Sequence, residues 1–180
     1  MKKAVVFSLA LTCCGNSDTS RQIPWRPRPA QAVAKVAEQR AVQGDSIYQV
    51  TKTRLTQVRM LASPYASVRI TSIKSDKAWM QKLQKGLQPM NLSTLDDLVN
   101  KAQEYFEELK THVEETKLEA ENAKISALAD NAENAEIYTR RAMEANRKAQ
   151  SKAETTLGLL QIIERVIDNI DLSRSRTDSK

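Results

Sequence analysis

The sequence is poor in the residues on which most catalytic folds depend. Among its 180 residues there are four Gly and one His, its two Cys are adjacent, and aromatic residues make up 4%. So few Gly and aromatics argue against β-sandwiches, β-barrels and nucleotide-binding α/β folds, which need many turns and bulky cores. One His and two adjacent Cys leave almost no material for a metal cage or a His-based catalytic centre. We therefore predict no enzyme, no cofactor, no metal site and no small-molecule substrate.

Motifs that carry chemistry are also missing. The sequence has no Gly-rich phosphate loop, no zinc-ligand spacing and no nucleophile elbow. His112 has Glu108 and Glu115 about one helical turn away, a spacing that can bind a metal weakly. We favour a solvated surface histidine instead. Paired glutamates on the same helix could do acid–base work only in a cleft that raises one pKa, and a slender helix offers no such cleft.

The formal net charge of +6 is unevenly distributed along the chain. Residues 1–36 carry +5, residues 37–92 carry +6, residues 93–138 carry −8, and residues 139–180 carry +3. A basic helix that lies against an acidic helix reduces self-repulsion, so we favour internal pairing over a basic face for nucleic acid. A nucleic-acid module would also need stacking aromatics or a known motif. We predict no nucleic-acid partner.

Residues 1–14 have the three-part plan of a bacterial secretory signal. A basic start is followed by an apolar run at 4–12, and then by Cys13 and Cys14. The run is too short to span a bilayer as a helix, which takes about 20 residues. Cys13 and Cys14 are the candidate lipidation residues of a lipoprotein leader, whose acyl chains bind a membrane at about 0.8 kcal/mol per CH₂. A plain cleaved signal and a mitochondrial presequence are the alternatives.

Residues 15–29 are predicted to form a Pro-rich tether. Three of the five prolines lie here and alternate with Trp and Arg, a pattern that favours extended polyproline-like backbone and resists helix. Trp25 is either a contact point for a membrane interface or protein partner, or an exposed side chain in a spacer.

A helical domain is predicted over residues 30–172, with a polar tail at 173–180. Apolar residues recur at steps of three and four from 30 to 62. Pro64 ends this helix, because the residue before a proline avoids helical geometry. A short helix at 76–88 carries Trp79, the second candidate contact residue.

The longest predicted helix covers residues 93–171. This stretch contains no Pro and a single Gly, Gly158, and Ser93 is expected to cap its start. The apolar register slips between Ala127 and Ala135, which allows a stutter, a bend or a loop between two helices. We expect one continuous helix with coiled-coil-like spacing, because no breaker residue is present.

The segment 157–170 is the most apolar stretch of this helix, whose middle is lined with alanine. Alanine buries little area, at about 25 cal/mol per Å², so an alanine seam needs length or several chains to be stable. The apolar segment suits either a core packed against residues 33–62 or a partner-binding surface, and the sequence leaves both open. Its candidate partner-binding residues are Leu157, Leu160, Ile163, Ile167 and Ile170.

Two protein families share parts of this plan. The stretch 119–156 (EAENAKISALADNAENAEIYTRRAMEANRKAQSKAETT), behind a Cys-terminated leader, resembles the alanine-rich coiled-coil lipoproteins of Gram-negative outer membranes. Those proteins form helical oligomers anchored by an acylated Cys. The order of helix 30–62, an irregular region and a long helix containing KAQSKAETTLGLLQIIERVI resembles the minor-pilus or pilus-tip subunits of type IV secretion and conjugation systems. This resemblance implies an exported, elongated, all-helical subunit.

We therefore predict an all-α protein, an elongated helical hairpin or three-helix bundle with a long coiled-coil-like C-terminal helix. The predicted function is that of a non-catalytic structural or assembly subunit, exported to the periplasm or the outer membrane and tethered there by its N-terminal lipid. It would act by helix–helix association with protein partners or its own copies, in an envelope or surface complex of the type IV secretion or pilus kind. A mitochondrial location is the alternative compartment. The alternative function is that of a lipid-binding amphipathic helical protein with an apolipoprotein-like plan, although the narrow alanine seam counts against it.

Overall fold

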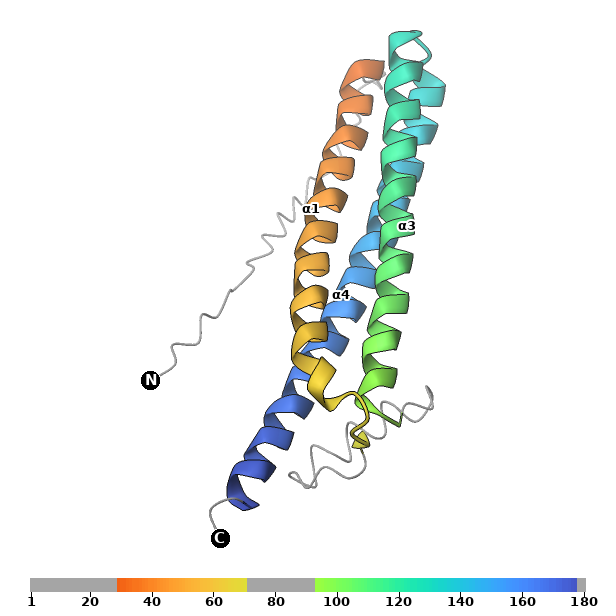
Figure 1. The fold of residues 1–180 in the computed structure, drawn as a ribbon. Helices are drawn as coiled ribbons and strands as arrows, with labels where there is room; N and C mark the ends of the chain where they lie inside the picture. The colour runs from red at the N-terminus through yellow and green to blue at the C-terminus, as the bar shows by residue number, and fades with distance from the viewer. Residues whose placement is uncertain (1–28, 71–92, 178–180) are drawn as a thin grey trace, which may run out of the picture.

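The computed structural model describes residues 29–70 and 93–177, with side chains described as far as residue 172. It is a three-helix bundle, which confirms the predicted all-α class (Figure 1). Helix α1 (Ala30–Ala62) ends in the 3₁₀ turn η1 (Ser63–Tyr65), and α3 (Leu95–Leu128) leads into α4 (Ala132–Thr177). Helices α1 and α4 run in the same direction and α3 runs against both (Figure 1). The leader, the predicted helix at 76–88 and nearly all of the tether lie outside the described residues.

Most buried positions of the three helices follow one pattern, and Leu98, Leu159 and Val166 are buried beside it. The positions of the pattern alternate in steps of four and three residues, which is the a/d repeat of a coiled coil. In α3, for example, Leu95, Val99, Ala102, Phe106 and Leu109 are all buried. The same repeat runs through α4 from Ala135 to Ile170. This repeat positions each helix so that one seam faces the other two.

The core changes character along the bundle axis. At the end where α1 stops and α3 starts, it consists of large side chains such as Leu55, Leu98, Phe106, Leu160 and Ile163. Towards the α3–α4 connection it consists almost wholly of alanine. Because hydrophobic stabilisation scales with apolar area, the large-residue end contributes most of it. The buried members of the alanine cluster are Ala30, Ala34, Ala37, Ala120, Ala123, Ala127, Ala135 and Ala142.

The expected single helix over 93–171 is wrong, because the chain turns back at residues 129–131. Asp130 adopts a left-handed conformation (φ 55°), which Asp and Asn tolerate better than most side chains. The N–H groups of Asp130 and Asn131 then bond to the carbonyls of Ala127 and Ser126, which closes α3 with a Schellman motif. Asn131 starts α4 by accepting the Asn134 N–H through its side chain at 3.0 Å. Neither Gly nor Pro is needed for this turn.

The start of α3 is fixed by a capping box. Thr94, rather than the expected Ser93, is the N-cap, and its hydroxyl accepts the backbone N–H of Asp97 at 3.2 Å. The Asp97 carboxylate accepts the backbone N–H groups of Ser93 at 2.9 Å and Thr94 at 2.8 Å. These hydrogen bonds to the ionised form lower the pKa of Asp97 to about 2.

Candidate interaction surfaces

The predicted partner-binding strip at 157–170 belongs to the core of this chain. Leu160, Ile163, Ile167 and Ile170 are each at most 7% exposed, and Leu157 is half-buried against the same cluster. These side chains pack on α1 and α3, so the core interpretation of this segment holds. The alternative that this strip binds partners is wrong, because its side chains are already buried within one chain.

The remaining candidate residues, Cys13, Cys14, Trp25 and Trp79, lie outside the described residues. Lipidation and the two tryptophan contacts therefore stay predictions. Within the described ranges, no helix holds an apolar stretch of the length and low charge that crossing a bilayer requires.

The bundle has a polar layer where Gly44 of α1 faces Asn146 of α4. The side chain of Asn146 is buried, and its Nδ2 donates to Gln43 Oε1 at 3.3 Å. Its Oδ1 is buried without a hydrogen-bond partner and faces Gly44. A buried Asn at a core position of a coiled coil fixes the register of neighbouring helices at some cost in stability. We assign this layer to the alignment of α1 with α4.

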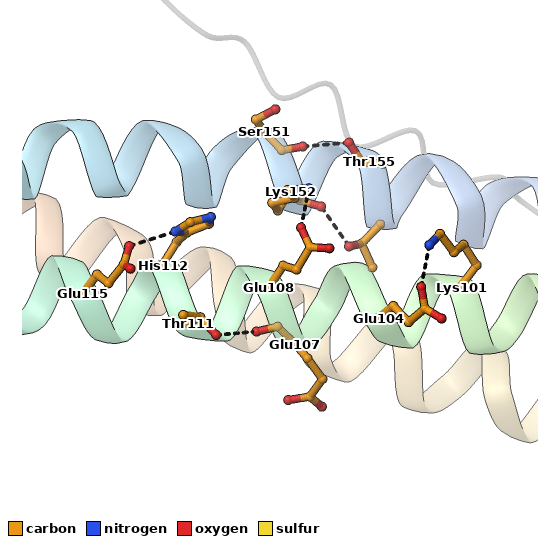
Figure 2. A network of polar contacts seen from close by, with 11 residues as sticks. Lys101, Glu104, Glu107, Glu108, Thr111, His112, Glu115, Ser151, Lys152 and Thr155 are labelled. Atoms are coloured by element: carbon orange, nitrogen blue, oxygen red, sulfur yellow. Dashed lines mark hydrogen bonds and ion pairs between the residues drawn. The ribbon is translucent and has the colours of Figure 1, made fainter. Parts of the chain in front are cut away.

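The polar contacts between α3 and α4 centre on Lys152. Glu108 of α3 reaches across to form an ion pair with Lys152 of α4 (Figure 2). The ammonium of Lys152 lies 5.0 Å from the ring centre of Tyr105, and that of Lys101 lies 5.1 Å from the same ring. The hydrogen bond from Lys101 to Glu104 raises the pKa of this lysine. The contacts of Lys152 with Glu108 and Tyr105 join α3 to α4, whereas Lys101 and Glu104 pair within α3.

His112 takes part in a local contact on α3. Its Nδ1 lies 2.9 Å from a carboxylate oxygen of Glu115 (Figure 2). Thr116 donates its hydroxyl to the His112 carbonyl. Among the residues that the structure describes, no group of three or more His, Cys, Asp and Glu side chains could hold a metal ion.

A small hollow lies where α1 ends and α3 begins. Its volume is about 210 Å³, and Arg59, Asp96 and Asn100 are among its lining residues. Asn100 donates to Asp96 at 3.1 Å, and Arg59 donates to Gln103 at 3.2 Å. Ligand pockets are usually larger, at about 300 to 1,000 Å³. The side chains of Arg59, Asp96 and Asn100 already form hydrogen bonds within the chain.

The expected pairing of a basic first helix with an acidic third region is met only in part. Helix α1 does pack on α3, but the ion pair between them has the opposite polarity: Lys117 of α3 meets Asp45 of α1 at 2.6 Å. The α1 cation Arg54 pairs with Glu164 of α4 instead, at 2.7 Å. The outer acids of α3 therefore remain on the surface rather than facing α1.

The three helices present outer faces of different charge. The acidic face of α3 consists of Glu104, Glu107, Glu108, Glu114, Glu115 and Glu121, together with Thr111, Leu118 and Ile125. The basic face of α4 consists of Arg140, Arg141, Arg147 and Lys148, with Glu144 among them. The uncharged face of α1 consists of Gln39, Val42, Ser46, Gln49, Val50, Thr53, Thr56, Gln57 and Met60, all of them exposed.

The uncharged face of α1 is unusual for a solvent-exposed helix in a chain that is 28% charged. Three of its apolar side chains are well exposed: Val42 at 72%, Val50 at 61% and Met60 at 74%. An open hollow of about 400 Å³ is lined by Gln49, Val50, Thr53 and Gln57 of this face and, at its edge, by Arg54. This face needs no charge to be desolvated when another surface covers it.

No family model, no curated protein and no solved structure matches this chain, so the assignment of these surfaces rests on its own residues.

Proposed function

We propose that the protein is a non-catalytic structural subunit that works by helix–helix association. In this proposal it is exported, tethered by its N-terminus, and part of an envelope or surface assembly of the type IV secretion or pilus kind. The observation that carries the proposal is the uncharged face of α1, which runs for most of the length of an otherwise charged bundle.

The physical argument starts from the cost of burying charge. When a surface becomes buried in a complex, each charge on it must lose its hydrating water, and this costs free energy. The centres of protein interfaces are accordingly depleted of charged residues. The outer faces of α3 and α4 carry many charges, whereas the uncharged face of α1 carries none between residues 39 and 60. The exposed charges of α1 in this range, Lys52, Arg54 and Arg59, lie beside that face. Another protein can therefore cover the uncharged face of α1 at a lower cost in desolvation free energy than the outer faces of α3 and α4.

A scaffold fits this fold better than the alternative lipid-binding function. Lipid-binding helical proteins cover acyl chains with wide faces of large apolar residues. In this bundle most of the large apolar residues, such as Leu109, Leu160 and Ile163, are inside the core, and the exposed ones are scattered over the three helices. Lipid binding would require the bundle to open, whereas protein association uses the surface as it stands.

Site-specific photo-cross-linking tests the proposal. A photoreactive residue is placed at Val50, on the uncharged face of α1, and the full chain is expressed in cells that contain the native envelope. We expect cross-linked products that contain protein in the membrane fraction. The matched control carries the same residue at Thr111, on the acidic face of α3, where cross-linking should be weaker. Equal labelling at both positions, or products that contain only lipid, would contradict the proposal.

A further inference from the structure

We propose that the uncharged face of α1 binds a second copy of this chain, with the two α1 helices antiparallel. This inference rests on the proposed function and names its partner. It follows from the spacing of the outer residues and from the order of the charges beside them.

The uncharged face contains a second coiled-coil seam. Its central residues alternate in steps of four and three, as the core residues do, but on the opposite side of α1. They are small or uncharged throughout, so two such seams can approach each other without burying a charge. The six residues of this outer seam are Val42, Ser46, Gln49, Thr53, Thr56 and Met60.

The charges that flank the outer seam are sorted by sign along the helix. One flank carries Glu38 and Asp45 in the first half of α1, then Lys52 and Arg59 in the second half, each seven residues apart. The other flank is uncharged, with Gln43, Val50 and Gln57 at its corresponding positions. This arrangement is informative because residues that flank a coiled-coil seam set partner choice and orientation.

Antiparallel pairing makes these charges complementary. When two copies meet around a two-fold axis near residues 47 and 48, Glu38 lies opposite the partner's Arg59. Asp45 then lies opposite the partner's Lys52, and symmetry repeats both pairs. In a parallel arrangement the charged flank of each helix would instead face the uncharged flank of the other. The sign order therefore selects the antiparallel dimer, which closes on itself and does not grow into a filament.

The contacts already present within the chain leave these side chains able to pair. Asp45 uses one carboxylate oxygen, Oδ1, for Lys117. Arg59 uses one terminal nitrogen, Nη1, for Gln103. The Nζ atom of Lys52 lies 5.9 Å from the ring centre of Tyr48, and the residue is exposed. A partner copy would use the atoms that remain.

The interface is one helix wide, which places it at the small end of specific interfaces. We therefore expect a dimer that dissociates on dilution. Tethering to a common surface would raise its population by increasing the effective concentration.

Sedimentation of charge variants of the full chain tests the inference. An acidic variant (Lys52→Glu with Arg59→Glu) and a basic variant (Glu38→Lys with Asp45→Lys) each place like charges opposite each other. Each should self-associate about tenfold or more weakly than the wild type, and an equimolar mixture should recover the mass of a dimer. The matched control, Arg147→Glu with Lys148→Glu on α4, should dimerise like the wild type. Circular dichroism checks that every variant keeps its helix content.

Chemical cross-linking tests the orientation, in a background with Cys13→Ser and Cys14→Ser. Ser46→Cys lies near the two-fold axis and should be joined to its own copy by a short bismaleimide. Met60→Cys should not react, because its copy would be about 37 Å away along the helix axis. Equal cross-linking at both positions would show a parallel dimer and overturn the inference.

A wild-type chain that stays monomeric at every concentration would overturn it too, as would a charge-variant mixture that fails to dimerise. In either case, cross-links from Val50 to a different protein would still support the proposed function, so the two failures are distinguishable.

Discussion

Gly44 of α1 lies directly against Asn146 of α4. A Cβ atom at position 44 would be 3.3 Å from Asn146 Oδ1 and 3.7 Å from the nearest methyl group of Val113. Glycine at this core position thus allows the close approach of α1 to both neighbouring helices. The cost is a lower helix propensity, of about 0.5 to 1 kcal/mol relative to alanine.

Substitution of Gly44 should therefore depend on size. Gly44→Ala gains helix propensity but crowds the Asn146 amide, so we expect its free energy of unfolding to stay within about 1 kcal/mol of the wild type. Gly44→Leu has no space and should cost about 1 to 3 kcal/mol or more. Urea denaturation followed by circular dichroism measures both changes.

Gly158 provides the control for this series. It is exposed on α4, and an added Cβ would meet nothing within 4 Å. Gly158→Ala should therefore stabilise the protein by about 0.5 to 1 kcal/mol. If Gly44→Leu were as well tolerated as Gly158→Ala, the close approach at Gly44 would be refuted.

The capping carboxylate of Asp97 should make stability depend on pH in the acid range. Its pKa falls from the ordinary value of 3.8 to about 2 in the folded protein, so its contribution is present above pH 3.8. That contribution is lost as the pH falls through about 2, because the protonated carboxyl no longer accepts the hydrogen bonds that favour the folded state. Asp97→Ala should cost about 1 kcal/mol at pH 7, as loss of a cap does.

The difference in unfolding free energy between wild type and Asp97→Ala should shrink between pH 5 and pH 2. Glu114→Ala, in the middle of α3, removes an exposed carboxylate that has no capping role and should show little such change. A constant difference for Asp97→Ala at all pH values would contradict the role of its ionised form.

Ile163 should behave as a core residue, in contrast to the exposed Leu118. Ile163 is completely buried, so Ile163→Ala should cost about 2 to 5 kcal/mol through lost burial and an unfilled cavity. Leu118 is exposed on the acidic face of α3, and Leu118→Ala should change stability by no more than about 0.5 kcal/mol. Thermal or urea unfolding of the two variants measures both changes in the free energy of unfolding. Similar small effects at both positions would mean that 157–170 is not the core.

The alanine-cored half of the bundle should open before the other half. Its buried side chains carry little apolar area, so local opening there costs less free energy. Native-state hydrogen exchange should show faster exchange of α3 amides at 117–128 than at 98–109, although both lie inside one continuous helix. Uniform protection along α3 would show that the two halves open as one unit.

Most of the fold could be predicted from apolar spacing. Helix α1 runs from Ala30 to Ala62, the bounds that its pattern and Pro64 predict. The turn between α3 and α4 could not be found by looking for Gly or Pro, because Asp130 and Asn131 form it with backbone and side-chain hydrogen bonds. The available signal was the pair Asp130 and Asn131, because Asp and Asn both tolerate a left-handed conformation and can cap a helix.

Polar residues in the core account for the other differences. In α4 the apolar pattern points to Tyr138 and Leu157, which are half-buried, whereas the four-three repeat buries Thr139 and Thr156. Asn146 is buried as well, next to Ala145, which the apolar pattern also points to. The hydroxyl of Thr156 donates a hydrogen bond to the Lys152 carbonyl within its own helix, so its burial leaves no donor without a partner. Hydrophobicity alone cannot identify such positions, but the unbroken four-three spacing can.

The outer face of α1 was missed for a related reason. Its defining property is the absence of charge at positions that form a stripe only once the helix orientation is known. The net charge of a segment sums all of its residues, including the flanking Lys52 and Arg59, so it does not reveal an uncharged stripe on one side of the helix.

The direction of the helices also determines how far the protein can reach. The chain enters the bundle at the start of α1, beside the α3–α4 turn, and α4 runs from that turn past the far ends of both other helices (Figure 1). With 46 residues at 1.5 Å each, α4 is about 69 Å long. If the start of α1 is held at a surface, the last turns of α4 lie about one helix length away from it. The protein would then act as a spacer of defined length.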